Sequence, residues 1–130
     1  MAWIDIPWTD WTPTITQGSA VTKTIGYAKY SRTGPVVHLV MQVTMTAAGT
    51  AANAIVISGI PASVRPLDVL MGTILILDSG TAYYHGSAYY NATDDTRGLA
   101  YGAGNFMGIN SPALTLASGD IIWLNCHYRV

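Results

Sequence analysis

The sequence predicts an all-β fold of the antiparallel sandwich or barrel class, and three observations support this prediction. First, charged residues make up 10% of the 130 residues, with no Glu and two Lys, so the straight-chain residues that usually cover the wet face of helices are scarce. Strand-favouring Thr, Val, Ile, Tyr and Trp stand in their place. Second, turn signals recur about every 8–12 residues. Third, no segment shows the 3.6-residue period of an amphipathic helix.

The first eighteen residues are predicted to form an extended arm or linker, and residues 19–130 a single β-sandwich domain. The two prolines of the arm fix their own φ and disfavour helix in the residues before them. Three of the four tryptophans lie in the arm, at Trp3, Trp8 and Trp11. Their rings must pack either within the chain or against a neighbouring chain.

Within the domain, runs of apolar residues between turn signals predict the strands. They span residues 21–32, 36–46, 54–58, 69–77, 81–91, 113–117 and 121–130. Residues 36–46 show the clearest alternation, because every second side chain from Val37 to Met45 is apolar and points to one side. The almost continuous apolar run 69–77 predicts a strand buried on both faces. Residues 94–98 are predicted to form a turn.

Composition and charge exclude several classes of function. The net charge is −1 and the six basic residues are scattered, which provides no electrostatic footprint for nucleic acid. The apolar run 69–77 is too short to span a bilayer, and residues 1–5 show no secretory signal. The single cysteine, Cys126, is predicted to be a small buried hydrophobic residue. So little charge on so apolar a chain also predicts a homo-oligomer, since identical chains can cover apolar surface together.

Several short motifs, in order along most of the chain, resemble one family. Trp8-Thr-Asp-Trp-Thr-Pro-Thr14 resembles the opening of many bacteriophage tail-fibre and minor tail protein C-terminal domains. The tyrosine-bearing stretch 27–30, the turn at Gly34 and the strand 36–46 resemble the next element of that family. Ile57-Ser-Gly-Ile-Pro61 resembles a strand end of that family, and Ser118-Gly-Asp120 with Ile122, Leu124 and Tyr128 resembles its last strand.

This resemblance implies a jelly-roll-like antiparallel β-sandwich, assembled as a homotrimer at the distal end of a phage fibre or tail tip. Such a domain binds host cell-surface carbohydrate and contacts other tail or fibre proteins. It would be made in the bacterial cytoplasm and reside in the virion. No fibrous shaft precedes the domain in this sequence, so the chain is either a fragment of a longer fibre or a small free-standing protein.

The segment 83–91 and the charged residues after it are the best candidate for a sugar-binding surface. Aromatic rings stack on the apolar faces of sugars, and Asp, Asn and Arg satisfy the hydroxyl groups. The predicted ligand-binding residues are Tyr83, Tyr84, His85, Tyr89, Tyr90, Asn91, Asp94, Asp95 and Arg97. The alternative is a purely structural role, because some of these tyrosines must face the core and adjacent aspartates often cap turns. Tyr101 and Asn105 are secondary candidates.

No catalytic motif or metal-ligand spacing is visible, so the sequence predicts neither an enzyme nor a cofactor. A glycosidase would need its two carboxylates from aspartates alone, and the adjacent Asp94 and Asp95 would diverge on a strand. His38, His85 and His127 are far apart in sequence. His38 is predicted to be a hydrogen-bonded sheet residue, with an ion site at a trimer axis as the alternative. Two further functions stay open: a purely structural virion component and a small polysaccharide hydrolase.

Overall fold

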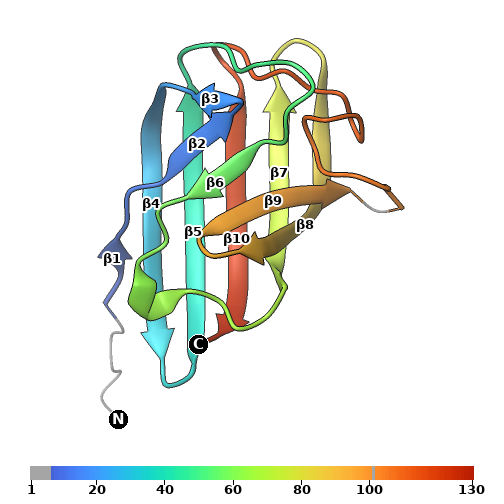
Figure 1. Cartoon of the computed structure of the whole chain (residues 1–130). Helices are drawn as coiled ribbons and strands as arrows, with labels where there is room; N and C mark the ends of the chain where they lie inside the picture. Colours follow the sequence, from blue (N-terminus) through green and yellow to red (C-terminus); the bar gives the residue numbers. More distant parts are fainter. Residues whose placement is uncertain (1–6, 101) are drawn as a thin grey trace.

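The strands of this chain join into one antiparallel sheet (Figure 1). The structure, a computed structural model, describes residues 7–100 and 102–130, so Trp3 and Tyr101 lie outside the described residues. The described residues form β1 (Thr9–Asp10), β2 (Thr14–Gln17), β3 (Ser19–Ala20), β4 (Lys23–Thr33), β5 (Val36–Met45), β6 (Val56–Ser58), β7 (Leu70–Asp78), β8 (Ala82–Ala92), β9 (Asp95–Ala100), β10 (Ile121–Arg129) and one 3-10 turn, η1 (Ala62–Val64).

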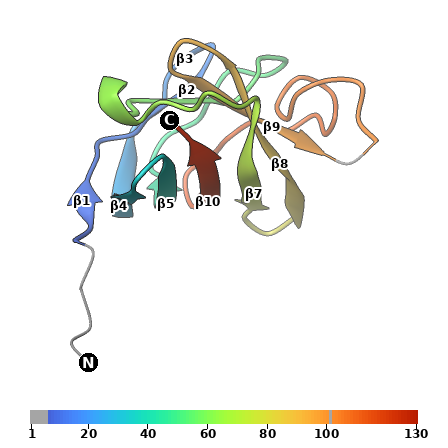
Figure 2. The ribbon, with the colours of Figure 1, turned by 90° about the horizontal axis from the view of Figure 1, so that it is seen from below.

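The sheet curls over on itself, so that its two ends form two layers (Figure 2). The strand order is β1-β4-β5-β10-β7-β8-β9-β6-β2-β3. The long strand β8 makes the corner, because its residues 82–89 pair with β7 and its residues 86–92 pair with β9. The smaller layer of β9, β6, β2 and β3 then covers the inner face of β4, β5, β10 and β7. The predicted all-β class is therefore confirmed, with both layers belonging to one continuous curled sheet.

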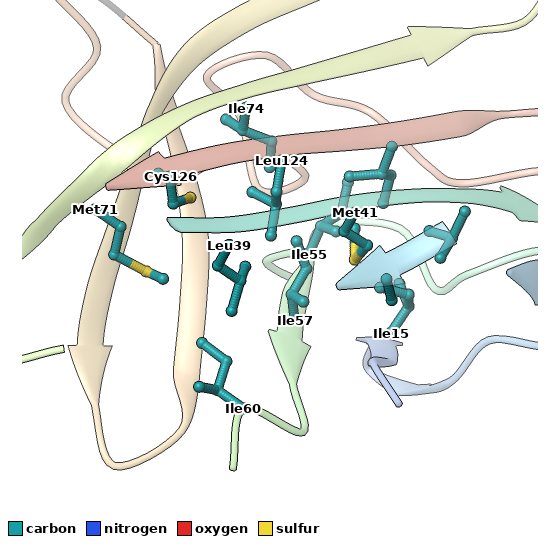
Figure 3. Close-up of a cluster of buried hydrophobic side chains, with 14 of the residues drawn as sticks. Ile15, Leu39, Met41, Ile55, Ile57, Ile60, Met71, Ile74, Leu124 and Cys126 are labelled. Carbon is teal, nitrogen blue, oxygen red and sulfur yellow. The ribbon is translucent and has the colours of Figure 1, made fainter. Parts of the chain in front are cut away.

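The core lies between the layers and follows the predicted alternation (Figure 3). In β5, the odd-numbered residues from Val37 to Met45 are buried. Side chains from β10, β6 and β2, among them Leu124 and Ile57, meet them from their own strands. Cys126 belongs to this cluster as a fully buried side chain, as predicted. Burial raises the pKa of its thiol to about 12, so the thiol stays protonated and unreactive at neutral pH.

The second half of the predicted arm belongs to the sheet. Strand β2 pairs with β6, and the Trp11 ring is buried while its indole nitrogen donates to the Val40 carbonyl at 3.3 Å. Trp11 therefore packs within its own chain. Trp8 remains 46% exposed. The prolines keep the backbone of this segment extended, and the residues after Pro13 form strand β2. In this strand, the apolar Ile15 points to the core side, as the alternation of a strand requires.

Three local expectations differ from the structure. Residues 113–117 alternate in burial but form no strand, because their backbone groups bond to loop and side-chain partners instead. Residues 95–98 belong to strand β9 and not to a turn. The chain reverses its direction in a shorter turn than predicted, which ends at Asp94 with a φ of +55°. Strand β7 is fully buried on one face only: Ile74 and Ile76 are buried, while Leu75 and Leu77 on the other face are half-buried.

Gln17 fastens two loops to the end of β2. Its side chain is fully buried. Its amide nitrogen donates to the carbonyls of Asn53 at 3.1 Å and Leu114 at 2.6 Å, and its amide oxygen accepts from the Leu116 nitrogen at 2.9 Å. One side chain thus satisfies three backbone groups from two loops that are distant in sequence. These loops border the candidate site described next.

Candidate functional site

Strand β8 divides the predicted tyrosine cluster between two faces of the sheet. Tyr84 and Tyr90 point inward and pack against the core. Tyr83, which is 65% exposed, and His85 point outward, opposite Leu77 and Leu75 of β7. The alternation of a strand makes this division unavoidable. The structure therefore does not gather the nine predicted residues into one surface.

Asp94 bonds to other residues of the same chain. Its carboxylate accepts hydrogen bonds from the backbone nitrogens of Gly59, at 2.8 and 3.0 Å, and Ile60, at 2.9 Å. Arg65 lies 3.6 Å from the same carboxylate. The Asp94 nitrogen donates to the Tyr90 hydroxyl at 2.7 Å. These contacts fasten the β8–β9 turn to the end of β6, and Asn91 lies exposed beside this turn.

A second group of the predicted residues does come together on the outer surface. Tyr89 of β8 lies directly opposite Arg97 of β9. Asp95, two residues before Arg97, accepts two hydrogen bonds from its guanidinium, at 3.0 and 3.1 Å. This bidentate pair raises the pKa of Arg97 and fixes the direction of its remaining donors.

Phe106 completes this group from the loop after β9. Its ring lies 5.2 Å from the Tyr89 ring, tilted by 52°, and the Arg97 guanidinium lies 5.1 Å from the Phe106 ring centre. Phe106 was not among the predicted site residues. The signal that could have found it is a lone phenylalanine in a glycine-rich loop. Asn105, a secondary candidate, accepts from the Phe106 nitrogen at 2.9 Å and so shapes this loop. Tyr89, Asp95, Arg97 and Phe106 are called the arginine–aromatic cluster below.

A hollow of about 440 Å³ adjoins the arginine–aromatic cluster. Its floor consists of paired residues from three neighbouring strands. Val56 of β6 lies opposite Arg97 of β9 on one side and opposite Thr16 of β2 on the other. The two loops that Gln17 fastens supply its walls. The lining residues are Thr16, Gly18, Ala52, Asn53, Ala54, Val56, Arg97 and Ile109. The hollow therefore combines small apolar side chains with an arginine, an amide and a hydroxyl group, which are groups that can hydrogen-bond a polar ligand.

A second hollow, of about 310 Å³, lies at the sheet edge between β1 and β4. It opens where the register of β4 shifts between Ile25 and Tyr27. Its charged groups are Asp10 and Lys29, which are bonded to each other at 2.7 Å. None of the nine predicted ligand-binding residues lines this hollow.

Across residues 7–100 and 102–130, no three His, Cys, Asp or Glu side chains gather in a way that could hold a metal ion. The imidazole Nε2 of His38 lies 3.0 Å from the Asn125 amide oxygen, which confirms the predicted hydrogen-bonded sheet histidine. No helix in the described part of the chain has the length and hydropathy needed to cross a membrane.

No protein-family model, curated protein or solved structure matches this chain. The likeness to phage tail proteins therefore rests on the sequence motifs alone.

Proposed function

We propose that this chain is a non-enzymatic attachment domain of a phage fibre or tail tip, which binds host cell-surface carbohydrate through the arginine–aromatic cluster. The observation that carries the proposal is the placing of two aromatic rings and an ion-paired arginine beside an open hollow. The ordered sequence motifs support the phage origin.

The chemistry of the cluster suits a sugar. The faces of Tyr89 and Phe106 match the apolar face of a pyranose ring, and the paired Arg97 and Asp95 can donate to and accept from neighbouring hydroxyl groups. Because the ion pair is already formed, little side-chain entropy is lost on binding. The hollow, at about 440 Å³, falls within the usual range of about 300–1,000 Å³ for ligand sites.

The homotrimer and the jelly-roll arrangement belong to the same proposal. The face of β4, β5, β10 and β7 that points away from the core carries apolar side chains such as Trp123 and Leu75. Among the described residues, its charged groups are Lys29 and Arg129, and each is ion-paired. A surface with so little free charge suits contact with other copies or with neighbouring tail proteins. Three linked copies would multiply a weak sugar affinity without new contacts.

The solution mass tests the assembly. Light scattering on a sizing column should give three times the chain mass of 13.8 kDa. A Trp123→Asp variant places a charge in the middle of the outer face, and its mass should fall to that of one chain. A wild-type chain that elutes as a clean monomer would contradict the trimer.

The carbohydrate proposal is tested with an array of bacterial surface polysaccharides. The labelled wild-type chain should bind at least one glycan, and Arg97→Gln and Phe106→Ala should each weaken that binding at least about tenfold, the equivalent of about 1.4 kcal/mol. Tyr83→Ala is the matched control, because Tyr83 lies on β8 but outside the cluster. Equal binding by wild type and Arg97→Gln would contradict the assigned site.

The alternative is a purely structural virion component, such as a trimerisation tip or a decoration protein. The low charge and the outer sheet face fit this alternative as well as they fit the attachment domain. A trimer that binds no glycan on the array and no bacterial cell would favour it. Release of reducing ends from a bound polysaccharide would instead favour the hydrolase.

A further inference from the structure

Two histidines that are far apart in sequence meet on the outer face of the sheet. His38 of β5 and His127 of β10 are directly opposite each other in the ladder. Their rings are stacked with centres 4.0 Å apart and planes inclined by 20°. Neither the fold nor the proposed carbohydrate site needs this arrangement, because both rings lie on the face away from the core.

Asn125 adds a third donor atom at the same place. It lies two residues before His127 on β10, so both side chains leave the strand on the same face. Its amide oxygen is 3.0 Å from Nε2 of His38. This hydrogen bond holds the Asn125 side chain beside the two rings, so three side chains with metal-ligating atoms lie together on the surface.

We propose that His38, His127 and Asn125 form a surface binding site for one divalent transition-metal ion. Two imidazole nitrogens and an amide oxygen suit Zn²⁺, Ni²⁺ or Cu²⁺, whereas Ca²⁺ and Mg²⁺ prefer oxygen ligands alone. In the isolated chain, water fills the remaining coordination positions, since His127 and Asn125 are exposed there.

Binding requires a small movement of the rings. In the stack, each imidazole faces the other, and chelation needs one nitrogen of each ring to point at a shared position above the sheet. Rotation about the Cβ–Cγ bond achieves this, and that torsion has broad minima. The metal–ligand bonds then replace the His38–Asn125 hydrogen bond.

The surroundings tolerate an added positive charge. Arg129, two residues after His127, is held by Asp68 at 2.6 Å. Lys29 is held by Asp10 at 2.7 Å. The only cysteine does not compete for the ion, because its thiol is buried on the opposite face of β10.

Calorimetric titration of the purified chain with ZnCl₂ and with NiCl₂ tests the site. We expect one ion per chain, no binding of MgCl₂, and an affinity at least about tenfold lower in His38→Gln and in His127→Gln. His85→Gln is the matched control, since His85 lies on the same sheet face but opposite Leu75 rather than in this cluster. Its affinity should equal that of the wild type.

Two measurements on chains with intact histidines keep the test decisive if a histidine variant fails to fold. Zn²⁺ should shift the ring nitrogen resonances of His38 and His127 and leave those of His85 unchanged. Ni²⁺ should quench the fluorescence of Trp8, whose ring centre is 5.2 Å from that of His38, and Trp8→Phe should reduce the total quenching. Wild-type affinity in His127→Gln, or no shift at either ring under saturating Zn²⁺, would overturn the site.

Discussion

Replacing Gln17 with leucine is expected to destabilise the fold by about 3–4 kcal/mol, because three backbone groups, one part-buried and two buried, lose their partner at once. The carbonyls of Asn53 and Leu114 and the nitrogen of Leu116 all bond to this one side chain. Each unsatisfied buried group costs about 1–3 kcal/mol, and the added apolar contact of leucine offsets part of the sum. Chemical denaturation followed by tryptophan fluorescence measures the effect.

Gln42→Leu is the matched control for this prediction. Gln42 is the other glutamine of the chain, and it lies half-exposed on the outer face of β5. Its replacement should change the free energy of unfolding by less than about 0.5 kcal/mol. Equal effects at the two glutamines would show that the bonds of Gln17 to the two loops contribute nothing special to stability.

Asp94→Ala is expected to destabilise the protein by about 2–3 kcal/mol. The carboxylate accepts from the nitrogens of Gly59 and Ile60, and hydrogen bonds to a charged group contribute about 1.5–3 kcal/mol. Alanine would also have to adopt the positive φ of this position, +55°, which aspartate and asparagine tolerate better. The loss should appear as a lower midpoint of thermal unfolding.

Asp95→Ala provides the comparison within the same dipeptide. The Asp95–Arg97 pair is only partly buried, with side chains 23% and 24% exposed, so its loss should cost no more than about 1 kcal/mol. The functional effects should be reversed: Asp95→Ala should weaken glycan binding, and folded Asp94→Ala should bind normally. If Asp94→Ala proved as stable as Asp95→Ala, the structural role of Asp94 would be wrong.

Alternation and turn signals were enough to predict the long strands. Residues 36–46 and 121–130 correspond closely to β5 and β10, because one face of each strand is buried and the period of two is strict. The same signal failed at residues 113–117. There Leu114 and Leu116 alternate in burial, but the pairing partner is the side chain of Gln17, and no local pattern reveals a partner that is about a hundred residues away.

The candidate site was harder to predict than the strands. The sequence located the tyrosine-rich segment but could not assign its faces, because inward and outward positions are set by the register with β7 and β9. Tyr84 and Tyr90 pack against the core for this reason. Phe106 reaches Tyr89 and Arg97 only through the path of the loop after β9. The His38–His127 pair likewise depends on the ladder between β5 and β10.

The most direct test of the proposed carbohydrate site is to map a bound glycan on the chain. Backbone resonances of the isotope-labelled protein would be followed during titration with an oligosaccharide fragment of a polysaccharide that binds on the array. We expect the largest shifts at Tyr89, Arg97 and Phe106, with small ones at Tyr83 and His85. Shifts confined to Tyr83 and His85 would contradict the arginine–aromatic cluster as the carbohydrate site, and the absence of any shift would contradict the attachment function itself.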